Sequence, residues 1–210
     1  YIPRDFSAEP FGSIVPAYEA DLIPESEWKD RIEELEKTKS GLNHLHDALK
    51  VPILMQGQLP YCWCYGVVGA MSMAYAQSGQ PVPHFSATSA AAKIMNYQRR
   101  GGWAAMAIKG IEKHGVSPIH YPDGSICWPE AVADPKYDTA KQRAFASNFK
   151  ATKFRELPSS SFAHAMTALL RRRPVTLGLP WWGHLVYALQ PVYYRGQFGL
   201  IIANSWDYDW

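Results

Sequence analysis

The sequence predicts an α+β protein with two lobes. Of its 210 residues, 47% are hydrophobic and 13% are aromatic, which is typical of a globular chain with a sizeable core. Apolar residues recur at helical spacing through the first half, whereas the end of the chain contains short apolar runs bounded by Pro and Gly. Helices followed by strands indicate an α+β protein, and the length suits two small lobes that share a core.

The charges are unevenly distributed along this chain. Residues 1–50 carry 11 acidic and 6 basic side chains, whereas residues 51–210 carry 8 acidic and 15 basic ones. The net charge of +2 does not indicate a nucleic-acid partner. Residues 51–92 contain no charged side chain, but Gln and Pro interrupt their apolar runs, so they do not predict a membrane span. We therefore expect neither nucleic acid nor a membrane as a partner.

The acidic first quarter predicts an arm with one helix. Residues 1–24 contain four prolines and one glycine, which indicates an extended segment. Residues 26–39 predict a helix that Ser26 caps and Gly41 ends. Its apolar side chains fall on one stripe, which predicts a docking face against the body: Trp28, Ile32 and Leu35.

The rest of the chain predicts five more helices and then three strands. Residues 62–77 are apolar nearly all round and end before Gly79, which indicates a buried central helix. Residues 116–136 contain four prolines and predict a loop. The other predicted helices cover residues 86–98, 103–114, 138–149 and 161–172, and the predicted strands cover residues 175–179, 184–189 and 198–203.

The cysteines and histidines predict neither a disulfide framework nor a metal site. Three cysteines are too few for such a framework and their number is odd, which favours reduced thiols and a reducing compartment. Cys64 and Cys127 are most simply core thiols. His44 and His46 have the spacing of half a metal site, but no Cys, Asp or His cluster completes it, so we expect no metal and no cofactor.

One set of side chains indicates nucleophilic catalysis. Cys62 follows a loop and opens the buried helix, where the positive end of the helix dipole favours the thiolate. Its own N–H group and the amide of Gln56 can donate to a developing oxyanion. His184 lies in an apolar strand as a candidate base, and Asn204 follows another strand, where its amide can orient the imidazole. A Cys at a helix start is most often a structural thiol, and these three partners favour the catalytic interpretation.

Three blocks in this order resemble the papain-like cysteine protease family. They are Gln56…Cys62-Trp63, Gly183-His184 and Asn204-Ser205-Trp206. His184 and Asn204 follow Cys62 by 122 and 142 residues, close to the family's usual separation of about 130–150. The pair Gly101-Gly102 and the predicted helix after it also match the family, and the resemblance covers about residues 51–210.

The resemblance implies a papain-like two-lobed fold for residues 51–210. A helical lobe of about residues 51–125 would carry the nucleophile helix, and a β-rich lobe of about residues 126–210 would carry His184 and Asn204. The implied reaction is hydrolysis of a peptide bond in a peptide or protein substrate, without a cofactor, through a thioester acyl-enzyme.

The resemblance also assigns roles to single residues. Cys62 would be the nucleophile, His184 the general base and then acid, Asn204 the residue that orients it, and Gln56 an oxyanion donor. Trp206 would shield the His–Asn hydrogen bond from water. The residues implied in substrate binding are Gly101, Gly102, Trp103, Ala104, Trp182 and Gly183.

Several features depart from the family pattern. Leu59 and the Arg99-Arg100 pair replace both partners of a family disulfide, which agrees with a reducing compartment and favours the cytoplasm. Tyr61 replaces a small residue beside the nucleophile, so we expect it to narrow access or to change what is bound. The family has more strand beyond Trp210, so we expect the domain's C-terminus to be incomplete here. Residues 1–50 exceed the family's usual N-terminal length, which predicts an inhibitory or docking segment that packs on the basic body, steered partly by charge.

Two other functions stay open at this point. One is a papain-fold binding or assembly module without peptidase activity, which Tyr61 and the unusual arm favour. The other keeps the chemistry but changes the substrate, as an amidase or acyl transferase acting on a non-protein amide.

Overall fold

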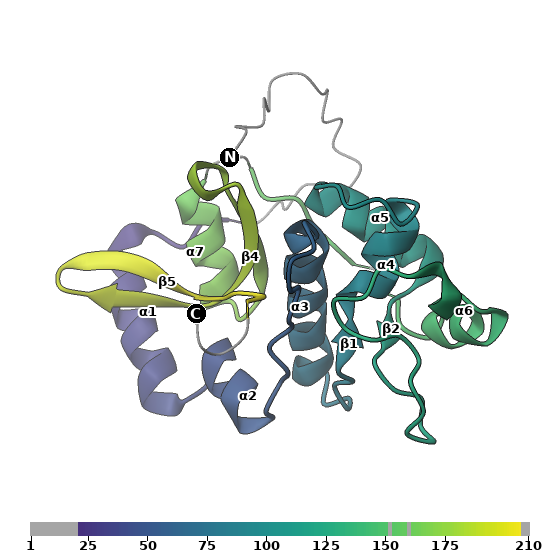
Figure 1. The fold of residues 1–210 in the computed structure, drawn as a ribbon. Helices are drawn as coiled ribbons and strands as arrows, with labels where there is room; N and C mark the ends of the chain where they lie inside the picture. Colours follow the sequence, from purple (N-terminus) through teal and green to yellow (C-terminus); the bar gives the residue numbers. More distant parts are fainter. Residues whose placement is uncertain (1–20, 151–152, 159–160, 207–210) are drawn as a thin grey trace.

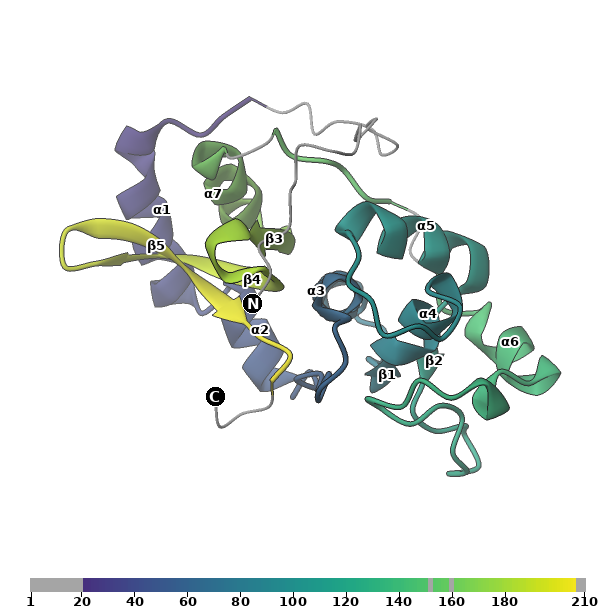
Figure 2. The same cartoon turned by 45° about the horizontal axis from the view of Figure 1, so that its top comes forward.

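The computed structural model describes residues 21–150, 153–158 and 161–206. A central helix, α3 (Cys62–Gln77), lies between a helical side and a β-rich side, as Figure 1 shows. Figure 2 looks nearly along α3 and separates the same two sides. The two-lobed α+β architecture therefore agrees with the predicted fold class. Within the described residues, none of the helices has the length and apolar character needed to cross a membrane.

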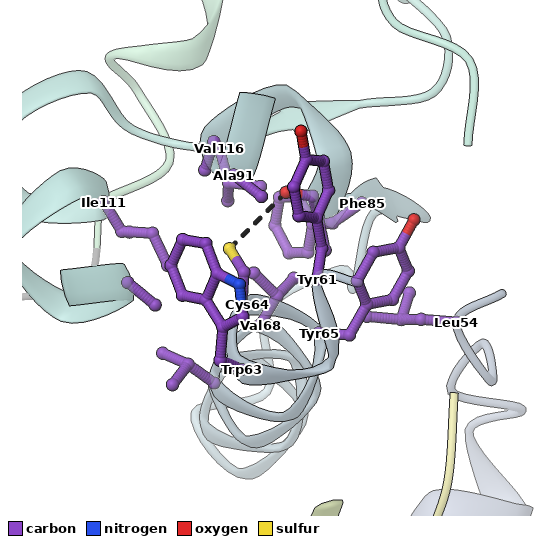
Figure 3. Packing of buried hydrophobic residues seen from close by; sticks show 14 of the residues in the cluster. Leu54, Tyr61, Trp63, Cys64, Tyr65, Val68, Phe85, Ala91, Ile111 and Val116 are labelled. Carbon is purple, nitrogen blue, oxygen red and sulfur yellow. Dashed lines mark hydrogen bonds between the residues drawn. The ribbon is translucent and has the colours of Figure 1, made fainter. Parts of the chain in front are cut away.

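The helical side packs around one face of α3. Its elements are β1 (Phe85–Ser86), α4 (Ala87–Ile94), α5 (Ala104–His114), β2 (Ser117–Pro118), η1 (Pro135–Tyr137) and α6 (Ala140–Ala146). Its core contains Trp63 together with Phe85, Ile111 and Trp128, and Figure 3 shows much of this packing from close by. Trp128 is fully buried here, and Phe149 packs against the same cluster. The helical side therefore extends well past residue 126, where the resemblance places the lobe boundary.

The β-rich side is a three-stranded antiparallel sheet with helices packed on it. The strands are β3 (Val175–Leu179), β4 (His184–Tyr194) and β5 (Gln197–Ala203), and their order is β3-β4-β5. The helices are α1 (Glu25–Thr38), α2 (Leu42–Ala48) and α7 (Phe162–Leu170), and the short helix η2 (Pro180–Trp182) connects β3 to β4. β4 runs five residues beyond its predicted end at residue 189, with a register shift against β5 between Ala188 and Gln190. Pro191 is tolerated in this strand because it lies beyond Ala188, where the pairing of β4 with β3 ends.

The helix ends differ from their predicted positions. α1 begins at Glu25 after Pro24, without a side-chain cap from Ser26, and it ends at Thr38, followed by the C-cap residue Lys39, whose φ of 51° is left-handed. Gly41 instead precedes α2, a helix that the sequence patterns did not separate from the arm. α4 ends at Ile94 rather than near residue 98, since Asn96 and Tyr97 also have positive φ.

Two glycines bring α3 unusually close to β4. A Cβ atom at Gly66 would lie 2.2 Å from Cδ2 of Leu185, and one at Gly69 would lie 2.3 Å from Cε1 of Tyr187. Larger residues would keep the helix further from the sheet. The close contact fixes the N-terminus of α3, which carries Cys62, relative to the strand that begins with His184.

The apolar stripe of α1 lies against α7 and the sheet. Trp28 makes edge contacts with Phe162 and Phe198, at centroid distances of 6.0 and 5.2 Å. Ile32 and Leu35 join the same buried cluster. These contacts are apolar, so charge complementarity does not carry this part of the packing. Residues 1–20, the remainder of the predicted arm, lie outside the described residues, and an inhibitory role for the arm stays a prediction.

Candidate active site

The predicted nucleophile, Cys62, is the first residue of α3 and is half-buried. A thiol at this position feels the positive end of the helix dipole, which stabilises the thiolate. The other two cysteines are free thiols in the interior, and burial raises the pKa of both Cys64 and Cys127. The three thiols therefore differ in environment, and Cys62 alone combines a helix N-terminus with partial exposure.

Tyr61 does not narrow access to Cys62 as expected. Its side chain is 0% exposed, packs edge-on against Trp63, and donates a hydrogen bond to the carbonyl of Gln98 at 3.0 Å. Figure 3 shows it among the buried side chains of the helical side. The expectation was wrong because the phenol finds both apolar packing and an acceptor inside that side.

His184 and Asn204 meet through the pairing of β4 and β5. The register opposes Tyr187 to Ala203, so the start of β4 lies beside the residues that follow β5. His184 Nε2 is 2.6 Å from Asn204 Oδ1, and the two residues are only 7% and 2% exposed. An amide oxygen can only accept, so Nε2 carries the hydrogen, and Nδ1 of the neutral ring is the acceptor.

The environment of His184 favours its neutral form. Burial lowers the pKa of its imidazole, and the hydrogen bond to Asn204 opposes this shift only in part. A neutral imidazole with an available Nδ1 lone pair can accept a proton, as a general base requires.

Two indoles flank the imidazole of His184. The rings of Trp206 and Trp182 lie at centroid distances of 4.6 and 5.1 Å from it, and 5.0 Å from each other. Trp206 is thus placed where it can exclude water from the His–Asn hydrogen bond. Trp182, implied as a wall of the substrate pocket, also packs against this group. Gly183 has a φ of 60°, the left-handed conformation that turns η2 into β4 just before His184.

Gln56 is held by contacts from a residue 149 positions away. Its backbone N–H donates to the carbonyl of Ser205 at 2.9 Å, and its Oε1 accepts from Ser205 Oγ at 2.5 Å. Its Nε2 donates to the carbonyl of Leu59 at 2.9 Å. A primary amide has two N–H bonds, so one remains for an oxyanion. Ser205 had no assigned role in the sequence patterns, since no local signal links it to Gln56.

The pair Gly101-Gly102 borders the nucleophile helix. Gly102 is buried, and a Cβ atom there would lie 2.7 Å from the indole of Trp63, the residue after Cys62. Trp103 is the N-cap residue of α5, and Ala104 is its first residue. Their substrate-binding roles stay predictions. In the described part of the chain no group of three or more His, Cys, Asp or Glu side chains could hold a metal ion.

Comparisons with known proteins support the fold. The sequence matches no protein-family model and no curated protein. Digestive procathepsin L 3 from the larval midgut of Tenebrio molitor is similar with a TM-score of 0.56 and 18% identity, over 80% of this chain and 58% of that one. Xylellain, a cysteine protease from Xylella fastidiosa, is similar with a TM-score of 0.54 and 17% identity, over 73% of this chain and 70% of that one.

A third similar structure comes from work on the mite allergens Blo t 1 and Der p 1, with a TM-score of 0.53 and 17% identity. It matches 77% of this chain and 60% of that one. The chain therefore spans less than two thirds of the procathepsin and mite-allergen chains. These similarities confirm the predicted papain-like α+β fold.

Proposed function

We propose that this protein is a papain-like cysteine peptidase that hydrolyses peptide bonds. The observation that carries the proposal is the 2.6 Å hydrogen bond between His184 and Asn204, packed under Trp206. This hydrogen bond lies at the start of β4, the strand that packs closely on α3, and α3 begins with Cys62. The fold similarity to cysteine proteases supports the same conclusion.

Acylation begins with transfer of the Cys62 proton to Nδ1 of His184. The thiolate attacks the carbonyl carbon of the scissile amide, and the carbonyl π electrons move to oxygen. The backbone N–H of Cys62 and an amide N–H of Gln56 stabilise this oxyanion. The C–N bond then breaks as the imidazolium donates its proton to the leaving amine, which leaves a thioester on Cys62.

Deacylation uses the same residues with water as the nucleophile. His184 accepts a proton from water while the oxygen attacks the thioester carbon. The C–S bond breaks, the carboxylic acid product leaves, and the imidazolium returns the proton to the Cys62 sulfur. Asn204 holds the ring orientation through both half-reactions, and the two indoles keep water from competing for its hydrogen bond.

The test combines covalent labelling with turnover. An epoxysuccinyl thiol probe is expected to label the wild-type protein once, at Cys62, and a mixed peptide library is expected to be cleaved. Cys62→Ala is expected to abolish both signals. Cys127→Ala is the matched control, because it removes a buried thiol remote from the proposed chemistry and is expected to keep both.

The outcomes separate the parts of the proposal. Folded wild-type protein that is neither labelled nor active would show that it is not a thiol hydrolase. Labelling of Cys62 without cleavage of any peptide would retain the nucleophile but reject the peptide substrate. The binding-module alternative loses part of its motivation, since the Tyr61 side chain is buried away from Cys62.

A further inference from the structure

The loop that carries Gln56 contacts a carboxylate that the proposed mechanism does not use. Glu130 Oε1 accepts a hydrogen bond from the backbone N–H of Met55 at 2.8 Å, one residue before Gln56. Its Oε2 lies 3.1 Å from Nε2 of His84. The Glu130 side chain is only 15% exposed, whereas His84 is 43% exposed. Both oxygens of a largely buried carboxylate are therefore engaged, one of them by the loop.

The residues beside Glu130 attach it to the nucleophile helix. The N–H of Ala131 donates to the hydroxyl of Tyr65 at 3.3 Å, and Tyr65 lies one turn after Cys62 on α3. Ala131 has a φ of 55°, and its Cβ would lie 3.2 Å from a Cβ at Gly57, the residue after Gln56. Residues 130–131 thus touch the loop on both sides of Gln56 and α3 at the same time.

Ser205 holds Gln56 from a different part of the chain. Its carbonyl and hydroxyl bind the backbone and side chain of Gln56, as described above. No disulfide fixes this loop, because all three cysteines are free and Leu59 occupies the core. An oxyanion donor is effective only when its N–H is already aimed before the charge develops. The loop therefore depends on non-covalent contacts for the geometry of Gln56.

We propose that Glu130 is a positioning residue for the oxyanion donor Gln56. Its carboxylate, oriented by His84, fixes Met55 and with it the start of the Gln56 loop relative to α3. The inference rests on the proposed peptidase function. Glu130 acts through Gln56 and not through the thiol, so its removal should weaken turnover without changing the reactivity of Cys62.

The test measures two rates that depend differently on the oxyanion. Alkylation of Cys62 by iodoacetamide displaces iodide and forms no oxyanion, whereas peptide hydrolysis forms one in each half-reaction. We expect Glu130→Ala to lower kcat/KM by about 10- to 100-fold, the loss typical of a misplaced group near the chemistry. The alkylation rate should stay within about twofold of wild type, since the N-terminus of α3 is unchanged.

Conservative and control variants complete the design. Glu130→Gln retains an oxygen acceptor for Met55 and is expected to restore most of kcat/KM. His84→Ala removes only the contact between His84 and the Glu130 carboxylate, so it is expected to lower kcat/KM by less than Glu130→Ala does. If Glu130→Ala does not fold, His84→Ala tests the proposal in its place. Asp123→Ala is the control, because that carboxylate also accepts from a backbone N–H, that of Ser125 at 2.9 Å, on an exposed turn. It should leave both rates unchanged.

A double-mutant cycle with Gln56→Ala tests whether Glu130 acts on turnover through Gln56. Gln56→Ala alone should lower kcat/KM by about 100-fold or more. Adding Glu130→Ala, or His84→Ala, to it should then cost nothing further. An equal loss in both backgrounds, or a parallel loss of alkylation, would overturn the inference while peptidase activity stands. A wild-type protein that is neither alkylated at Cys62 nor active would overturn the proposed function and this inference with it.

Discussion

Gly66→Ala is expected to separate the nucleophile from its base. The new Cβ would lie 2.2 Å from Cδ2 of Leu185 and 3.2 Å from the backbone oxygen of Val186. The Leu185 methyl can rotate away, but the backbone of β4 cannot move without moving His184, which begins this strand. The close contact between α3 and β4 therefore opposes any side chain at this position.

The energetic cost can be estimated from two opposing effects. Alanine is favoured over glycine in a helix by about 1 kcal/mol, while overpacking a tight contact costs about 1–3 kcal/mol. The free energy of unfolding should therefore fall by roughly 0–2 kcal/mol. If relief of the contact shifts α3 by part of an ångström, kcat/KM should fall by about tenfold or more, since a 1 Å displacement can cost about 100-fold.

Urea unfolding and peptide hydrolysis measure these two effects. Gly178→Ala is the matched control, because this glycine lies in β3 and a Cβ there would meet nothing within 4 Å. It should change the free energy of unfolding by less than about 0.5 kcal/mol and leave turnover unchanged. If Gly66→Ala matches the wild type in both measurements, the α3–β4 contact does not set the geometry of Cys62 and His184.

Three further predictions concern packing and protonation. Trp28→Ala should lower the free energy of unfolding by about 3–5 kcal/mol, measured in urea, and an unchanged value would show that α1 does not stabilise the β-rich side. Tyr61→Phe should cost only about 0.5–1.5 kcal/mol, the net contribution of one hydrogen bond, because the Gln98 carbonyl also accepts from the N–H of Arg100 at 2.8 Å. It should keep kcat/KM, and a large change in turnover would place the ring in the site after all. Because the pKa of His184 is lowered in the folded protein, stability should fall as pH drops from about 6.5, the unfolded-state pKa, towards that lowered value. His184→Gln should reduce this slope, and an unchanged slope would assign it to other groups such as His114, whose pKa is also lowered by burial.

Local patterns predicted the central elements well. The all-round apolar character of residues 62–77 matches α3 at both ends, and the apolar run of residues 175–179 matches β3. α2 was harder to predict, because a seven-residue helix is marginal alone and forms through packing of side chains such as Leu42 in the β-rich core. The lobe boundary was misplaced because Trp128 follows a proline-rich stretch that carries no periodic signal of the side on which it packs.

For the candidate site too, some features follow from local sequence patterns and others only from the folded structure. Sequence pattern and order along the chain select Cys62, His184 and Asn204 as candidates, since a thiol at a helix start and polar residues bordering apolar strands are local features. Contacts between distant residues came only from the folded chain: Ser205 with Gln56 and Glu130 with Met55. Such pairings depend on how helices and strands pack, which local propensity does not encode. Tertiary packing therefore decided how the loop carrying the oxyanion donor is held.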